Sequence, residues 1–335
     1  MQHGIKRQHL SEEAKKSKLE KDQIKIKNYK SLVDQLFQFR DDNLYNEDIF
    51  KLTTKCLLIN PEFYTMWNYR REILLNLNNT EIFINYLKED LIFLLGLLKK
   101  FPKCYWIWNH RKWCLMELVD LNKADWDFEF NTISKLLELD ERNFHCWQYR
   151  RYIIANMKKD LDSTVIEEID RREFDYTTTK IQNNFSNFSA WHQRACSIKL
   201  VKHENSYDCL KDELDLIKTG IFMSPEDTSI WLYVKYLLTD TFFIDSIKSK
   251  NDYMDILQDQ LKVVEEVNEL ENEDTGKDNV ECLKMIIFLK DLIMKQEGND
   301  KFDKDIQNII HKLVDLDPLR KGRYKDMLQN QVLTE

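Results

Sequence analysis

Residues 103–113 read KCYWIWNHRKW, and most of this stretch belongs to a pattern that the chain repeats. Its relatives are NPEFYTMWNYRR (60–71), FPKCYWIWNHRK (101–112), DERNFHCWQYRR (140–151), NFSNFSAWHQRA (184–195) and SPEDTSIWLYVK (224–235). Aligned on Trp67, Trp108, Trp147, Trp191 and Trp231, these stretches follow one another at 41, 39, 44 and 40 residues. A period of this length is typical of helical-repeat arrays, in which each unit packs against its neighbours.

The four prolines of the chain all mark one place in this repeat. Pro61, Pro102 and Pro225 stand six residues before their tryptophans, and Pro318 stands six residues before Tyr324. Proline is tolerated at the first position of a helix, where its missing N–H has no intrahelical partner, and Asn, Ser or Asp is a good N-cap. We therefore expect a helix to begin at this place in each repeat, with caps at Asn60, Asp140, Ser224 and Asp317.

The segments before these helices carry apolar residues at spacings of three and four, so each repeat is predicted to be a helix, a tight turn and a second helix. We expect one domain over 1–335, with repeats near 44–78, 85–118, 126–158, 167–200, 208–239 and 302–328. Between Trp231 and Tyr324 there is room for two periods, so one repeat lacks the pattern. That interval contains EEVNELENEDTGKDNV (265–280), which we interpret as an acidic surface loop.

The repeated aromatic and basic residues are interpreted as scaffold. An aromatic residue three before the tryptophan and an arginine three after it are predicted to share one helix face with it. These residues are Tyr64, Tyr105, Phe144 and Phe188, and Arg70, Arg111, Arg150 and Arg194. We expect the tryptophan to fill the seam between hairpins and the guanidinium to satisfy carbonyl groups at a neighbouring turn.

Composition supports long helices and excludes several classes of function. Only 6 Gly and 4 Pro occur among 335 residues, and the formal net charge of −8 argues against a nucleic-acid partner. The seven cysteines lack C-x-x-C spacing, and no H-E-x-x-H occurs, which predicts reduced thiols and no metal site in this chain. The longest apolar run, LIFLLGLL (91–98), is too short to span a bilayer and is predicted to be a buried helix. The first residues lack the apolar core of a signal peptide, so we expect a cytoplasmic protein.

Function is sought in the positions that differ between copies. Five residues before the tryptophan, only the second and third copies are basic, at Lys103 and Arg142. Two residues before it, only the third copy has a histidine, His145, with Asn143 two residues earlier. Because equivalent positions of successive hairpins line one surface, these four residues and Tyr105 could form one polar patch at two neighbouring helix starts. Basic residues at helix starts attract anions, so the residues alone predict a helical-repeat scaffold with an anion site.

The repeated P-x-x-[YF]-x-x-W-x-x-R hairpins resemble those of the α subunits of protein prenyltransferases. Within that family, the chain looks like the α subunits of the type II enzymes, the Rab geranylgeranyltransferases. The stretches that carry the resemblance are HGIKR (3–7), NPEFYTMWNYRR, YWIWNHR (105–111) and EFDYTTTKIQNNFSNFSAWHQR (173–194). The resemblance covers nearly the whole chain.

This resemblance implies a crescent-shaped, right-handed, TPR-like array of hairpins that wraps around a β subunit encoded elsewhere. The β subunit would hold the isoprenoid and a catalytic zinc ion, whereas this chain would bind no cofactor of its own. The heterodimer would transfer geranylgeranyl from geranylgeranyl diphosphate to C-terminal cysteines of Rab GTPases that an escort protein presents. His3, near the N-terminus as in relatives, is a further candidate for reaching the zinc of the partner.

The resemblance also assigns roles to the polar patch. Lys103 and Tyr105 match a K-x-Y-x-x-W segment, and Asn143 and His145 match an N-x-H-x-W segment, both of which lie near the diphosphate in the family. Lys103, Tyr105 and His145 are therefore expected to be catalytic, with Asn143 and Arg142 binding or orienting the diphosphate. Phe144 departs from the family pattern, because a tyrosine often stands there.

Two other functions remain open at this point. The chain could be the α subunit shared by farnesyltransferase and type I geranylgeranyltransferase, although it lacks a long proline-rich N-terminal extension. It could also be a non-catalytic helical-repeat adaptor that holds a peptide or another subunit. The adaptor function explains the scaffold equally well, but it leaves Lys103 and His145 without a role.

Overall fold

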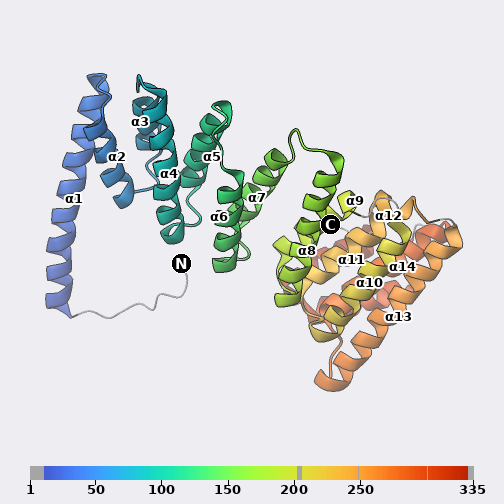
Figure 1. Cartoon of the computed structure of the whole chain (residues 1–335). Helices are drawn as coiled ribbons and strands as arrows, with labels where there is room; N and C mark the ends of the chain where they lie inside the picture. The colour runs from blue at the N-terminus through green and yellow to red at the C-terminus, as the bar shows by residue number, and fades with distance from the viewer. Residues whose placement is uncertain (1–10, 202–205, 248, 300, 331–335) are drawn as a thin grey trace. The chain divides into compact units, whose positions relative to one another are not determined.

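The computed structural model describes residues 11–330, apart from 202–205, 248 and 300, and every element in this described part is a helix (Figure 1). The prediction of an all-α helical-repeat fold is therefore confirmed. His3 lies outside the described residues. No disulfide joins the seven cysteines, all of which are described. None of the described helices combines the length and the apolar character that a bilayer-spanning segment requires.

The chain divides into two compact units, Met1–Met157 and Lys158–Glu335. The first unit contains α1 (Glu12–Asp41), α2 (Glu47–Ile59), α3 (Tyr64–Leu75), α4 (Thr80–Lys100), α5 (Tyr105–Asp120), α6 (Trp126–Leu139) and α7 (Phe144–Met157). The second contains α8 (Ser163–Asn183), α9 (Phe188–Val201), α10 (Ser206–Met223), α11 (Thr228–Thr239), α12 (Thr241–Ile244), α13 (Lys250–Thr275), α14 (Val280–Glu297), α15 (Lys304–Leu316), the short 3₁₀-helix η1 (Pro318–Arg320) and α16 (Lys321–Asn330).

The predicted hairpins are present as pairs of consecutive helices. In the first unit, α2 pairs with α3, α4 with α5 and α6 with α7, and these pairs lie side by side (Figure 1). In the second unit, α8 pairs with α9, α10 with α11 and α15 with α16. The pair of α13 and α14 is the repeat that lacks the tryptophan pattern, as the spacing predicted. The apolar run at 91–98 lies in α4, where Leu91, Leu94, Leu97 and Leu98 are buried, which confirms that prediction too.

The prediction that the second helices begin at the prolines is wrong for the first five repeats. Helix α3 begins at Tyr64, three residues after Pro61, and α7 begins at Phe144. The proline instead occupies the turn, and Asn60 and Asp140 are the C-cap residues of the preceding helices α2 and α6. Ser224 likewise belongs to the turn after α10, and Asp227 caps α11. Only Pro318 stands at a helix start, that of η1, after Asp317.

The turn is held by the tryptophan indole, which explains the fixed spacing of six. In each of the five copies, the indole Nε1–H donates to the carbonyl of the residue six before it, at 2.7–2.9 Å. The five tryptophans are between 1 and 7% exposed. In the sixth copy, Tyr324 is also buried, and its hydroxyl donates to Asp317 instead. The interpretation of the tryptophans as scaffold is therefore confirmed, with a backbone partner that was not foreseen.

The repeat arginines bind mainly buried carboxylates, which the sequence analysis missed. Arg70 binds Asp90, Arg111 binds Glu129 and Arg194 binds Glu213, each through at least two guanidinium nitrogens. Carbonyl groups are additional acceptors, as predicted, but those of Phe50 and Leu91 lie within helices rather than in turns. Each carboxylate belongs to the first helix of the next repeat, so the ion pairs join neighbouring hairpins. Arg150 is equally buried, at 2% exposed, and donates to Ser134.

The prediction of an acidic loop over 265–280 is wrong for most of that range. Helix α13 continues to Thr275, and Gly276 ends it in the left-handed conformation, with φ of 71°. Only residues 276–279 form the connection to α14. Apolar residues such as Val264 and Val267 are buried on α13, so packing against α14 stabilises a helix despite the acidic composition.

Candidate functional site

Lys103 and His145 are carried by neighbouring turns that one side chain connects. Lys103 lies in the turn between α4 and α5, and His145 is the second residue of α7. Asn143 stands just before α7, where its Oδ1 accepts from the backbone N–H groups of His145 and Cys146 at 3.0 and 3.3 Å. Its Nδ2 donates to the Pro102 carbonyl at 3.1 Å. Asn143 therefore caps α7 and fixes it to the turn that carries Lys103.

The imidazole of His145 lies in an aromatic enclosure. It packs edge-on against Tyr105, with ring centroids 4.3 Å apart, and lies parallel to Trp108 at 6.0 Å. Only 5% of the residue is exposed, and Nε2 has no hydrogen-bond partner among the described residues. Burial lowers the pKa of His145 below its ordinary value of 6.5, and a hydrogen bond with the Lys103 backbone opposes this shift. We infer that the Nδ1–H group of His145 donates to the backbone carbonyl of Lys103. The ring is then neutral and has a free lone pair on Nε2.

The structure brings the predicted residues together to different degrees. Tyr105, Asn143, His145 and the backbone of Lys103 meet at one place. The side chains of Lys103 and Arg142 are exposed, and within the described part of the chain neither makes a hydrogen bond or ion pair. Tyr105 is 63% exposed although it begins α5. The turns next to the shielded imidazole thus carry two exposed and unpaired basic residues, Lys103 and Arg142, and such positive charge suits an anionic ligand.

The other chemically notable cluster is buried in the scaffold. Asp90, His110 and Cys114 offer ligand atoms that lie within 4.8 Å of one another. However, His110 uses both ring nitrogens: Nδ1 accepts from Arg71 at 3.1 Å, and Nε2 donates to Asp90 at 2.9 Å. Burial also raises the pKa of the Cys114 thiol well above its usual value, so the thiolate that zinc needs is disfavoured. These residues do not fit a metal site.

The position of His110 in the repeat explains this cluster. Two residues after the tryptophan, the copies read Tyr69, His110, Tyr149, Gln193 and Tyr233. Tyr149 donates to Glu129 at 2.7 Å and Tyr233 donates to Glu213 at 2.8 Å, as His110 does to Asp90. Sequence reasoning could have found these carboxylates, because each follows a repeat arginine by 18 to 20 residues, in the first helix of the next repeat.

Comparison with known proteins agrees with the repeat pattern. The family model described as "Protein prenyltransferase alpha subunit repeat" matches residues 46–77, 87–118, 126–157 and 170–199. These are the first four predicted repeats. The two later helix pairs with partial patterns, α10 with α11 and α15 with α16, lie outside the matched residues.

Relatives extend the similarity over nearly the whole chain. A Candida albicans protein named "Geranylgeranyl transferase type-2 subunit alpha" is 49% identical over 98% of this chain and 98% of its own length. A Saccharomyces cerevisiae protein of the same name is 36% identical over 98% of this chain and 99% of its own length. The solved structure of Candida albicans protein geranylgeranyltransferase-I complexed with GGPP matches with a TM-score of 0.66 and 21% identity, over 91% of each chain, which shows the shared fold. The chain therefore belongs to the protein prenyltransferase α-subunit family, in its geranylgeranyl transferase type-2 branch.

Proposed function

We propose that this chain is the α subunit of a heterodimeric Rab geranylgeranyltransferase. Together with a β subunit, it transfers geranylgeranyl from geranylgeranyl diphosphate to C-terminal cysteines of Rab GTPases, which an escort protein presents in the cytoplasm. The observation that carries this proposal is the 49% identity to a type-2 α subunit over 98% of both chains. The exposed side chain of Lys103, whose backbone contacts the shielded ring of His145, supports a role for this chain at the diphosphate.

The transfer exchanges one bond for another at a single carbon. The cysteine thiolate of the Rab attacks C1 of the geranylgeranyl group, so an S–C bond forms as the C1–O bond breaks. The diphosphate leaves with the bonding electron pair and gains negative charge in the transition state. A positive group held beside the leaving oxygen lowers this barrier, because its interaction strengthens as charge develops. In this proposal Lys103 supplies that charge, and its ammonium is available because it makes no ion pair among the described residues.

The remaining residues support Lys103 in different ways. Asn143 orients the site, since it fixes the Pro102 carbonyl to the start of α7. The neutral ring of His145 holds the Lys103 backbone and offers its free Nε2 as an acceptor to a donor on the substrate or partner. Tyr105 shields that ring, and its exposed face borders the ligand. Arg142 adds a second positive charge at the edge of this site.

The β subunit supplies what this chain does not carry. In this proposal, it holds the apolar cavity for the isoprenoid and the zinc site. When bound there, zinc would lower the pKa of the Rab thiol and favour the thiolate. The cluster of Asp90, His110 and Cys114 does not fit that role, because both His110 nitrogens are hydrogen-bonded within the scaffold and burial raises the pKa of the Cys114 thiol.

The variant Lys103→Ala tests the role of this chain in the chemical step. In the complex with the cognate β subunit, we expect the single-turnover transfer rate to fall roughly 30- to 1,000-fold. This corresponds to a loss of about 2 to 4 kcal/mol of transition-state stabilisation. Assembly with the β subunit, measured by co-elution in size-exclusion chromatography, should not change. Lys100→Ala, an equally exposed lysine in the last turn of α4, is the matched control and should retain the wild-type rate.

Two outcomes would contradict the proposal. An unchanged transfer rate in Lys103→Ala would remove this chain from the diphosphate and favour an adaptor function. Efficient transfer to a peptide ending in a CaaX sequence, without an escort protein, would favour the α subunit of a type I enzyme. Both measurements use the same reconstituted heterodimer, so one preparation distinguishes the three functions.

A further inference from the structure

Helix α1 extends well past the helix on which it packs. It has 30 residues, about 45 Å, whereas α2 has 13 residues, about 20 Å (Figure 1). Helix α2 ends beside Tyr29 of α1, because the side chain of Asn60, the residue after α2, donates to the Tyr29 hydroxyl at 3.0 Å. Leu36, further along α1, is fully buried. From residue 12 to 28, by contrast, every α1 residue except Asp22 is exposed.

The exposed part of α1 continues the apolar seam that α2 covers. Leu19, Ile26 and Val33 follow one another at intervals of seven, and Tyr29 and Leu36 lie three residues after the last two of them. This is the a/d spacing by which helices pair along a narrow seam, although Asp22 occupies the position three residues after Leu19. Val33 and Tyr29 are half-buried, but Leu19 and Ile26 are 61% and 54% exposed. The same seam is therefore partnered in one half of the helix and bare in the other.

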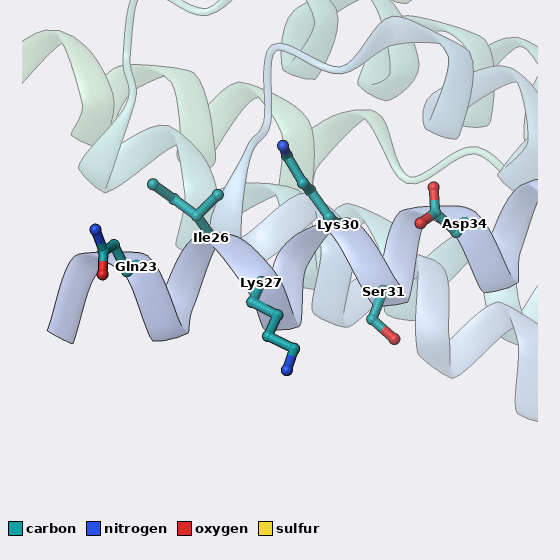
Figure 2. A pocket seen from close by; sticks show the side chains of 6 residues that line it. All are labelled: Gln23, Ile26, Lys27, Lys30, Ser31 and Asp34. Carbon is teal, nitrogen blue, oxygen red and sulfur yellow. The ribbon is translucent and has the colours of Figure 1, made fainter. Parts of the chain in front are cut away.

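A hollow lies along α1 near the point where α2 no longer covers it. It has a volume of about 520 Å³ and is lined by Gln23, Ile26, Lys27, Lys30, Ser31 and Asp34. Figure 2 shows Ile26 and Lys30 on one side of α1, and Lys27 and Ser31 on the other. Ile26 belongs to both the seam and this hollow, whose other lining residues are polar, so an apolar side chain on the seam would meet Ile26 with Lys30 next to it.

The charge of this segment indicates which kind of partner fits. Residues 12–30 hold seven lysines against four carboxylates, a net charge of +3 in a chain whose formal charge is −8. Lys18, Lys25 and Lys30 flank Leu19 and Ile26 at the positions that, in paired helices, face the charged flanks of the partner. Lys25 has only a loose ion pair with Asp22, at 3.8 Å, in which the lysine side chain is 80% exposed and the aspartate side chain 48% exposed.

We propose that residues 15–30 of α1 bind an acidic helix of another protein through the seam of Leu19 and Ile26. Such a helix would place apolar residues against the seam and glutamates against the flanking lysines. Pairing with α1 of a second copy would place lysines against lysines, which is unfavourable. A membrane-bound helix needs a broad apolar face, whereas this seam is one residue wide between lysines, and Ile24 lies on the opposite side. The proposal concerns a surface remote in sequence from Lys103 and does not depend on the proposed function.

The test uses the full chain in complex with its β subunit and a designed acidic peptide. The probe is a fluorescein-labelled peptide of four heptads with Ile at a, Leu at d and Glu at e and g, and binding is measured by fluorescence anisotropy. We expect the wild type to bind and the double variant Leu19→Asp/Ile26→Asp to bind at least about tenfold more weakly. Raising the NaCl concentration from 50 to 500 mM should also weaken binding, because exposed charges are then screened.

The control is Ile24→Asp, which introduces one aspartate, against two in the double variant, at an equally exposed position on the other side of α1. This variant should bind as the wild type does, and circular dichroism should show equal helix content in all three proteins. No binding by the wild type, or equal loss in Ile24→Asp, would overturn the proposal. Seam-dependent binding to vesicles of phosphatidylcholine and phosphatidylserine would overturn it in favour of a lipid surface. Seam-dependent self-association in analytical ultracentrifugation would overturn it in favour of a second copy.

Discussion

The buried arginines show how a single residue can join two repeats. Arg111 is fully buried, and Glu129 meets its guanidinium with two hydrogen bonds of 2.6 and 2.9 Å. Tyr149 donates to the same carboxylate from α7. Taking these charges out of water is costly, so each is stable there only because the others satisfy its hydrogen bonds. Removing one member should therefore cost more than an exposed ion pair contributes.

Glu129→Ala tests this argument. The substitution leaves the Arg111 guanidinium buried without its carboxylate, so we expect the free energy of unfolding to fall by about 3 to 5 kcal/mol. Urea denaturation followed by tryptophan fluorescence measures the change. Glu138→Ala, which removes an exposed carboxylate from the same helix α6, should change stability by less than about 0.5 kcal/mol. Similar losses in the two variants would mean that the buried pair stabilises the fold no more than a surface charge does.

His110 should make the fold sensitive to mild acid. Burial lowers the pKa of His110 to about 4, although Asp90 opposes this shift, and the positive charges of Arg70 and Arg71 add to it. Because the folded-state pKa lies below the ordinary value of 6.5, the unfolded chain takes up the proton first. Stability is then complete above about pH 6.5 and decreases as the pH falls toward 4, with a slope of up to about 1.4 kcal/mol per pH unit.

The measurement is the free energy of unfolding in urea between pH 7.5 and 5, where most carboxylates remain ionised. His110→Gln should be less stable than the wild type at pH 7.5 and should have a smaller slope, and the buried His145, whose pKa is also lowered, accounts for part of what remains. His311→Gln, which changes an exposed histidine on α15, should keep it. A wild-type stability that does not vary over this range would show that His110 accepts a proton in the folded state.

At the scale of helices, two glycines differ in the space around them, so only one of the two positions requires glycine. A Cβ atom on Gly220 of α10 would lie 2.9 Å from two ring atoms of Phe185 and 3.0 Å from Ile230. A Cβ atom on Gly96 of α4 would meet nothing within 4 Å. Close helix packing therefore demands glycine at position 220, whereas at position 96 glycine only weakens the helix.

These two positions give a paired prediction. Gly220→Ala should destabilise the fold by about 1 to 3 kcal/mol, because the ring of Phe185 must move within a packed interior. Gly96→Ala should stabilise it by about 0.5 to 1 kcal/mol, because alanine loses less backbone entropy in a helix. Thermal unfolding of both variants would show shifts of opposite sign. If Gly220→Ala also raised the midpoint, the contact between α10 and Phe185 would have to be looser than the structure indicates.

Helix content, hairpin order and the register of the tryptophans could be predicted because they depend on local spacing. The helix starts could not, since the proline pattern is compatible with both a first helical position and a turn. The bond from the Trp67 indole to the Pro61 carbonyl decides between the two, and it appears only when the backbone is folded. Helix α13 shows the same limit, because an acidic composition predicted a loop where packing against α14 stabilises a helix.

The candidate site could be predicted only in part for a related reason. Comparing copies found Lys103 and His145, because they differ from the repeated scaffold. The bridging role of Asn143 depends on a contact with Pro102, 41 residues earlier, which no local pattern shows. Asp90 and His110 resemble a metal or catalytic cluster in composition, and only their saturated hydrogen bonds assign them to the scaffold.

For the whole molecule, the geometry of the site predicts dependence on a second chain. Lys103 and Tyr105 are exposed, and the lone pair of His145 Nε2 has no partner in the described chain, so the polar groups are arranged for a ligand that this surface alone does not enclose. Electrostatic stabilisation of a leaving group is strong only where water is excluded. We therefore expect no measurable transfer by the purified chain, and activity that rises with added β subunit to a plateau at one equivalent. Because the partner binds the folded chain, the unfolding midpoint should also rise with β-subunit concentration. Transfer by the chain alone at the rate of the complex would mean that water is excluded from Lys103 without a partner.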